Sequence, residues 1–313
     1  MPFKPASRSL FLLLVSCLAA WVASAGSPQA VAAATSSELE GQLRALIVGF
    51  PGTVTLHARH LESGAEVGIE PDQPVRTAST IKLPIACAVA AQVAAGRARW
   101  DERLTVSAAS KVSGSGVLSE FSDGETISLR DAVRLMIVVS DNTATNLVLD
   151  RIGADAVNDH MDSLDLQRTR AMRKIRGDGT QLKAATGWSR AGLEPENQGF
   201  GIGSSTPREM TRLLGMLADG KVVDEAASRE LLDTLERQQY KDGIGRQSGS
   251  MRVASKSGSL DALRSDVGIV WTPQGRIAIA ITVDDMPGID YSPDNAGNLL
   301  ISRLSQRIIA ELR

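Results

Sequence analysis

Residues 75–95 are almost uninterruptedly apolar, rich in alanine, free of glycine and nearly free of charge. Such a segment predicts a helix that is buried on nearly every side. Pro84 limits where this helix can begin, because proline is tolerated only in the first turn, where its missing N–H would be unpaired anyway. We therefore expect the helix to begin near Ser79 or Thr80, with Ser79 at its N-terminal end.

The rest of the chain divides into helical, strand-like and loop segments. Helical spacing of apolar residues predicts helices over residues 36–50, 128–139, 143–152, 207–217, 225–240 and 294–312. A capping box, Ser36 or Ser37 followed by Glu38 or Glu40, is expected to start the first of these. Alternation predicts strands over residues 53–61, 66–69, 250–256, 265–272 and 276–283, and the first two are expected to form a hairpin.

Strands thus occur at both ends of the chain and helices in the middle. This order predicts an α/β (α+β) fold, with a mainly antiparallel sheet flanked by the terminal helices and a separate all-helical lobe. We assign residues 36–78 and 245–313 to the α/β lobe and residues 79–244 to the helical lobe of one domain, residues 26–313. The long polar loop at residues 176–205 is typical of a functional segment.

The first 25 residues read as an export signal. Lys4 and Arg8 precede an apolar run at residues 10–22, and Ala23-Ser24-Ala25 forms a small-residue cleavage site. The run is short for a bilayer span, and no later stretch reaches the required length, so no membrane span is expected in the mature chain. The protein is expected to be periplasmic or secreted.

Cys17 gives a rival interpretation of the same segment. Residues 14–17 (LVSC) resemble a bacterial lipoprotein processing box, which would leave a lipid anchor on Cys17. Cleavage after Ala25 would instead leave Cys87 as the one cysteine, so no intramolecular disulfide can form. Cys87 is expected to be inert packing in the buried helix.

Composition and charge limit the classes of partner and substrate that the chain is expected to bind. Apolar residues make up 43% of the chain and charged residues 22%, as in ordinary globular proteins. Loss of Lys4 and Arg8 would lower the basic count from 34 to 32, against 36 acidic residues. This balance excludes nucleic acid or an anionic membrane as the expected partner. The three histidines show no ligand spacing, so neither a metal site nor a Ser-His-Asp triad is expected. We expect a small-molecule substrate, no cofactor and a monomer.

Lys82 is the one residue that does not suit the buried helix. A cation is disfavoured in the first turn, and its neighbours offer no counter-charge. Ser79 lies three residues earlier on the same helical face, within reach of the lysine amine. Burial would lower the pKa of that amine and allow it to activate the hydroxyl as a nucleophile. The alternative is a serine N-cap followed by a lysine that extends to solvent.

Two later tripeptides have equally simple alternatives. Ser140-Asp141-Asn142 lies between two predicted helices, where plain helix capping would explain it. Lys256-Ser257-Gly258 lies on or beside a predicted strand, where a turn with an exposed lysine would suffice. In the order Ser79-x-x-Lys82, Ser140-Asp141-Asn142, Lys256-Ser257-Gly258, however, the three together resemble the signature of the penicillin-recognising serine hydrolases, specifically their class A β-lactamase-like branch.

The resemblance implies a role for each residue. Ser79 would attack an amide carbonyl and form an acyl-enzyme, while Lys82 takes its proton. Ser140 would pass a proton to the departing nitrogen. Lys256 would hold the substrate carboxylate and keep Lys82 neutral, and Asn142 would bind the side-chain amide of the substrate. Residues that border the substrate through their backbone or hydroxyl groups would be Ser257, Gly258 and Ser259, the last sharing an oxyanion hole with Ser79.

One expected feature of that branch is missing. Class A enzymes resemble one another in a loop glutamate that activates water, but residues 172–175 (MRKI), where the resemblance places it, carry no carboxylate. The nearest similar motif is Glu194-Pro195-Glu196-Asn197, so Glu194 is the candidate if the loop folds over the site. Otherwise Glu194 and Glu196 are solvated charges. The function expected is β-lactam hydrolysis, and the alternative is an acyl-trapping penicillin-binding protein or a D-Ala peptidase or esterase.

Overall fold

The computed structural model describes residues 1–3 and 28–313. Its centre is a five-stranded sheet in which every neighbouring pair is antiparallel. The strand order is β2 (Glu66–Ile69), β1 (Thr53–His60), β10 (Gly275–Asp284), β9 (Leu263–Thr272) and β8 (Arg252–Leu260). The first and last parts of the chain therefore build one sheet, which confirms the predicted fold class and the hairpin of β1 and β2.

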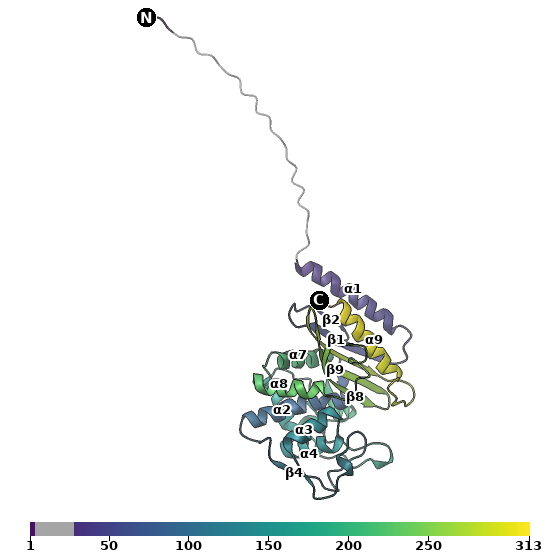
Figure 1. Cartoon of the computed structure of the whole chain (residues 1–313). Coiled ribbons are helices and arrows are strands. Elements are labelled where there is room, and N and C mark those ends of the chain that lie inside the picture. Colours follow the sequence, from purple (N-terminus) through teal and green to yellow (C-terminus); the bar gives the residue numbers. More distant parts are fainter. Residues whose placement is uncertain (4–27) are drawn as a thin grey trace.

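Helices cover both faces of this sheet (Figure 1). The two terminal helices, α1 (Pro28–Ile47) and α9 (Ala296–Glu311), pack on one face and bury side chains such as Leu43, Leu56 and Leu304. On the other face lie α7 (Pro207–Ala218) and α8 (Glu225–Glu236). Because both faces are covered, the central strands are buried along nearly their whole length.

The helical part surrounds α2 (Lys82–Ala94). Residues 82–90 of this helix are all buried, as the apolar run predicted, because other helices contact it from several sides. These neighbours are α3 (Leu129–Val138), α4 (Asn142–Ile152), α5 (Ala154–Ser163) and α8. Cys87 lies within this core, and burial raises the pKa of its thiol to about 12, so the expectation of an inert cysteine fits its surroundings.

Short elements occupy the connections. Two small antiparallel sheets are formed by β3 (Val75–Arg76), β7 (Gly203–Ser205) and β6 (Arg170–Ala171), and by β4 (Arg103–Thr105) with β5 (Thr126–Ser128). The segment predicted as a loop at residues 176–205 also contains α6 (Arg190–Leu193) and the 3-10 helices η3 (Gly179–Gln181) and η4 (Pro195–Phe200). Another 3-10 turn, η2 (Leu118–Glu120), lies in the loop before β5.

Three predicted boundaries were wrong by four residues or more. Helix α1 begins at Pro28, so Ser36 and Ser37 lie inside it and form no capping box. Helix α8 ends at Glu236 and not at residue 240, because Gln238 turns inward to the sheet. Strand β8 continues past residue 256 to Leu260, since its pairing with β9 extends to the Leu260–Leu263 pair.

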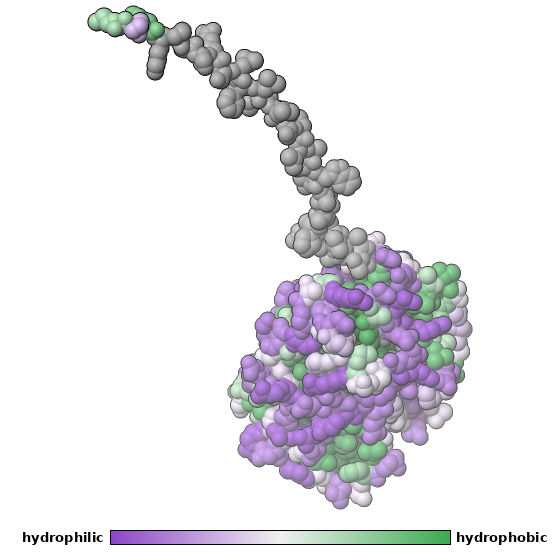
Figure 2. Space-filling view, turned by 45° about the horizontal axis from the view of Figure 1, so that its top comes forward, coloured by the Kyte–Doolittle hydropathy of each residue, from purple (hydrophilic) through white to green (hydrophobic). Residues whose placement is uncertain are grey.

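The face drawn in Figure 2 is mostly hydrophilic, with apolar residues in scattered patches. Within the part of the chain that the structure describes, no helix has both the length and the apolar character needed to cross a bilayer. The proposed export signal, its cleavage site and Cys17 lie outside the described residues.

Candidate active site

Ser79 lies in a 3-10 turn, η1 (Ala78–Ile81), that leads directly into α2. The residue before this turn, Thr77, is held in place by β7. Its N–H and its Oγ1 both donate to the Gly203 carbonyl, at 3.1 and 2.9 Å. Ala78 adopts a positive φ of 46°, a strained conformation for a residue with a side chain. Ser79 is thereby presented at the helix N-terminus with its side chain partly exposed.

Lys82 has no exposed surface and points its amine at the turn before α4. Its Nζ donates to the Ser140 carbonyl at 2.6 Å and to Asn142 Oδ1 at 2.9 Å, and lies 3.2 Å from Ser140 Oγ. In the described part of the chain, the hydrogen bonds of this amine go to these two residues and not to Ser79. Lys82 therefore joins the first predicted motif to the second.

The Ser140-Asp141-Asn142 turn combines capping with a functional geometry. Asp141 accepts the Ala144 N–H at 2.8 Å as the N-cap of α4, and its other oxygen accepts the N–H groups of Val117 and Leu118. Ser140, in contrast, has a positive φ of 53° and directs its hydroxyl toward Lys82. The capping interpretation is therefore correct for Asp141 alone.

Lys256 lies on β8 and is likewise without exposed surface. Its Nζ donates to the Ser257 carbonyl at 2.7 Å and to Gln238 Oε1 at 3.3 Å. Gln238 also accepts the N–H and the hydroxyl of Ser257 at 2.7 and 2.9 Å, and donates to Ser255 Oγ. This buried glutamine, which sequence reasoning missed because it belongs to no motif, fixes the whole Lys256–Ser257 segment.

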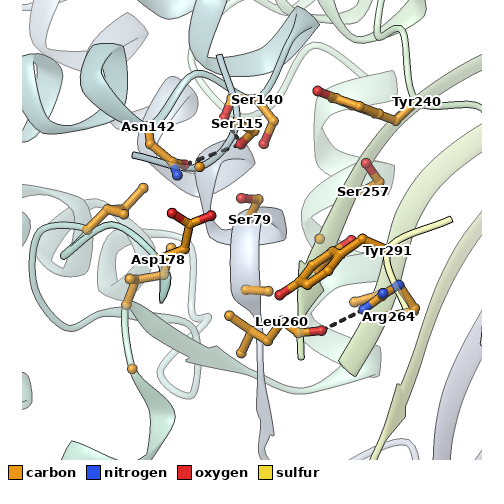
Figure 3. A pocket seen from close by; sticks show the side chains of 18 of the residues that line it. Ser79, Ser115, Ser140, Asn142, Asp178, Tyr240, Ser257, Leu260, Arg264 and Tyr291 are labelled. Carbon is orange, nitrogen blue, oxygen red and sulfur yellow. Dashed lines mark hydrogen bonds between the residues drawn. The ribbon is translucent and has the colours of Figure 1, made fainter. Parts of the chain in front are cut away.

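Gly258 brings β8 into contact with the Ser79 turn. A Cβ at this position would lie 2.8 Å from the Thr77 carbonyl oxygen and 2.9 Å from the Ser79 nitrogen, so only glycine allows the approach. Figure 3 shows the result, with Ser79 between Ser140 and Asn142 on one side and Ser257 on the other. These residues line one cavity of about 740 Å³ together with Gly258 and Ser259.

Both lysines lose proton affinity in this environment. Burial lowers the pKa of Lys82 well below its usual value, and the nearby charge of Lys256 lowers it further. Burial also lowers the pKa of Lys256 to about 7, partly offset by the buried carboxylate of Asp266. A neutral Lys82 amine can accept a proton, which is what a base next to a serine hydroxyl must do.

Parts of the loop at residues 176–205 line this cavity, but the structure does not bring Glu194 to it, so Glu194 is not the deacylation candidate that the sequence offered. Glu194 is exposed and is absent from the cavity wall, as is Glu196. Pro195 favours an extended backbone at Glu194, and the Asn197 side chain donates to the Ala191 carbonyl, while only Phe200, at the far end of η4, reaches the cavity wall. Glu194 and Glu196 are solvated charges.

Ile175, in the segment where the family resemblance places a glutamate, lines the cavity. Its backbone N–H and carbonyl are both bound by the side chain of Asn146, at 2.8 and 2.9 Å. Asn146 follows the Ser140-Asp141-Asn142 motif by four residues on α4, so the same helix positions the motif and this segment. No motif in the sequence identifies this contact.

Several further polar side chains line the cavity without having been predicted. They are Asp178, Arg173, Arg176, Tyr240, Arg264 and Tyr291. Arg264 is buried, donates to backbone carbonyls and lies 4.8 Å from the ring centre of Tyr291. None of the three histidines lines this cavity.

Comparison with known proteins was consistent with this geometry. Residues 38–312 match the model of the β-lactamase enzyme family. β-Lactamase L2 of Stenotrophomonas maltophilia is 28% identical over 259 residues, which cover 79% of this chain and 78% of that protein. The crystal structure of a β-lactamase from Sphaerobacter thermophilus is 31% identical, covers 88% of this chain and 97% of its own, and superimposes with a TM-score of 0.75.

A second kind of relative is similar to the same extent. The structure of a leucine-to-glutamate mutant of PBP-A, described as an acyl-enzyme complex with penicillin G, is 27% identical. It covers 88% of this chain and 96% of its own, with a TM-score of 0.73.

Proposed function

Because the chain belongs to the β-lactamase enzyme family, we propose that it hydrolyses β-lactam rings through an acyl-enzyme on Ser79. The observation that carries the proposal is the meeting of Ser79, Ser140 and Ser257 around one cavity, with the amines of two buried lysines directly behind its wall. Three segments far apart in the sequence supply these groups.

Acylation begins at the Ser79 hydroxyl. Ser79 Oγ attacks the lactam carbonyl carbon as its proton passes to the neutral amine of Lys82, directly or through Ser140. The C–N bond of the ring then breaks, and the Ser140 hydroxyl gives its proton to the departing nitrogen and recovers one from Lys82. The lowered pKa of Lys82 makes both transfers feasible near neutral pH.

The developing oxyanion needs fixed donors. Ser79, in η1 just before α2, and Ser259, on β8, both line the cavity, and their backbone N–H groups are the proposed donors. Removal of one donor of this kind typically costs about 3 kcal/mol in the barrier. The close approach at Gly258 sets the spacing between these two donors.

The charge of Lys256 acts on the substrate carboxylate from behind the cavity wall. Its amine has no exposed surface, so in the free protein the groups that would touch the carboxylate are the hydroxyls of Ser257 and Ser259. An arriving carboxylate would raise the pKa of Lys256 again and keep it charged. Asn142, whose Oδ1 accepts from Lys82 and whose Nδ2 donates to the Ser113 carbonyl, is the proposed partner of the substrate amide.

Deacylation is the step for which the chain offers the fewest groups. Ile175 lines the cavity and Glu194 is exposed outside it, so among the described residues no glutamate borders the cavity to activate water. This favours a second candidate function, in which Ser79 is acylated quickly and the acyl group is released from it slowly. An acyl-trapping penicillin-binding protein or a D-Ala peptidase would behave in this way. An acyl-enzyme with penicillin G is described for the leucine-to-glutamate mutant of PBP-A, a protein of similar structure.

One experiment separates the two functions. The purified protein is mixed with a chromogenic cephalosporin, and product formation and intact mass are recorded together. Sustained colour at a rate above the background supports hydrolysis, whereas a single burst equal to the protein concentration, with a persistent mass adduct, supports acyl trapping. Ser79→Ala should abolish both signals, and Ser37→Ala, on the exposed surface of α1, should change neither.

We also propose that the protein is exported. The support is the pair Lys4 and Arg8 before the apolar run at residues 10–22 and the Ala23-Ser24-Ala25 site. N-terminal sequencing of the mature protein tests this: a start at Gly26 supports a secreted or periplasmic protein, and a lipid-modified Cys17 supports an anchored one.

A further inference from the structure

Asp178 is an exposed carboxylate on the wall of the catalytic cavity that the proposed mechanism does not use. In the described part of the chain its hydrogen bonds involve only its backbone, and its carboxylate forms no ion pair. Figure 3 shows this carboxylate pointing into the space between Asn142 and Ser79. The group is therefore available to a ligand.

Asp178 and Asn142 border the same part of the cavity. A Cβ placed on Gly114 would lie 2.5 Å from Asn142 Nδ2 and 3.5 Å from Asp178 Oδ2, so both side chains face the space next to that glycine. Asn142 is the residue proposed to bind the side-chain amide of the substrate. A substituent that extends from this amide would meet Asp178.

Ser113 holds the two residues in this relation. Its hydroxyl accepts the Asp178 N–H at 2.9 Å, and its carbonyl accepts Asn142 Nδ2 at 3.0 Å. Gly177, with a φ of 88°, allows the approach, because a Cβ there would lie 2.7 Å from Ser113 Oγ. The position of Asp178 is thus built into the loop.

The nearby guanidinium groups are engaged elsewhere. Arg173 donates to the Lys174 carbonyl and stacks on Trp188, with 5.6 Å between guanidinium carbon and ring centre. Arg176 donates to the Lys183 carbonyl at 2.9 Å. Neither forms an ion pair with Asp178, so the negative charge at this point of the wall is not neutralised by direct contact.

We propose that Asp178 is a specificity-determining residue that selects acyl donors carrying a protonated amine on the side chain next to the amide bound by Asn142. The inference rests on the proposed acylation of Ser79. An ammonium group at that place would face Asp178 at the cavity mouth, where an opposite charge attracts it. Because the carboxylate is exposed, the expected preference is modest.

Two penicillins that differ by a single amine test the proposal, one with an α-aminobenzyl and one with a benzyl side chain. The rate of Ser79 acylation by each is measured by intact mass at pH 6.5, where the amine is protonated. We divide the acylation rate with the α-aminobenzyl penicillin by the rate with the benzyl penicillin. This ratio should be about three- to fivefold lower in Asp178→Asn than in the native protein, as expected for the loss of an exposed ion pair. Glu196→Gln, an exposed carboxylate outside the cavity on the same loop segment, should leave the ratio unchanged.

The alternatives give different results. An unchanged ratio in Asp178→Asn overturns the proposal while leaving the proposed function intact. If Asp178→Asn lowers the acylation rate equally with both penicillins and lengthens the lifetime of the adduct, the proposal is also overturned. Asp178 would then act in the formation and hydrolysis of the acyl-enzyme. Failure of the native protein to be acylated by either penicillin overturns the proposed function and this inference with it.

Discussion

Gly258 packs against the backbone nitrogen of Ser79, so closely that a Cβ on the glycine would lie 2.9 Å from that nitrogen. Strand β8 and the turn that carries Ser79 are thus in direct contact through backbone atoms. The contact fixes the spacing between Ser79 and Ser259, whose N–H groups are the proposed oxyanion donors.

Gly258→Ala should therefore impair acylation more than folding. The added methyl group must push β8 away from the Ser79 turn, and a displacement of this kind in a catalytic site costs about 100-fold in rate. We expect the acylation rate constant, measured by intact mass against time, to fall by that order while the far-UV circular dichroism is unchanged. Gly41→Ala is the control, because a Cβ there meets nothing within 4 Å. Normal acylation by Gly258→Ala would show that the spacing is not critical.

The pKa of Lys256, about 7, predicts an alkaline limb in the activity of the free protein. As pH rises through this value Lys256 loses its charge and attracts a carboxylate substrate less, so kcat/KM should fall above pH 7. Lys256→Arg keeps the charge, because arginine stays protonated throughout the range. In this variant the limb should disappear from the pH profile, whatever the absolute rate. A limb that persists at the same pH must come from another group.

The lowered pKa of Lys256 also predicts how the free energy of unfolding depends on pH. The pKa of Lys256 is about 7 in the folded protein, whereas an ordinary lysine has a pKa of 10.5, so between these values the unfolded chain binds more protons at this residue. The contribution of Lys256 to the free energy of unfolding should therefore rise with pH, by up to about 1.4 kcal/mol per unit.

Urea unfolding of the native protein and Lys256→Met at pH 7, 8 and 9 measures this contribution. The native protein should gain stability relative to the variant at each step. Lys221→Met provides the comparison, since the Lys221 side chain is 70% exposed. A difference between native protein and Lys256→Met that stays constant with pH would contradict the lowered pKa.

Ile175→Glu should shorten the lifetime of the acyl-enzyme. Asn146 fixes the backbone of residue 175 at the cavity wall, so a glutamate there would place a general base near the acyl group. A general base typically raises the rate of such a step about 100-fold or more. The decay of the mass adduct after removal of excess β-lactam measures the effect, and Ile175→Gln separates the base from the shape change. Equal decay in both variants would mean that the carboxylate does not reach the water.

The helix at Ser79, the two later motifs and the antiparallel sheet could be recognised in the sequence because each depends on local pattern. Apolar spacing, the position of Pro84 and the alternation in β9 and β10 all act within a few residues. A local pattern also made Glu194 a candidate, because residues 194–197 (EPEN) resemble the loop motif of class A enzymes. The position of Glu194 outside the cavity depends instead on how the whole loop packs, which no local pattern records.

By itself, the sequence determined the family resemblance, the order of elements and the identity of Ser79, Lys82, Ser140 and Lys256 as candidates. Only the tertiary structure decided that Gln238 binds Lys256, that Asn146 holds Ile175 at the cavity wall, and that Asp178 lies beside Asn142. These relations join residues from different elements. They exist only once burial has packed the helices against the sheet, so no short pattern in the sequence records them.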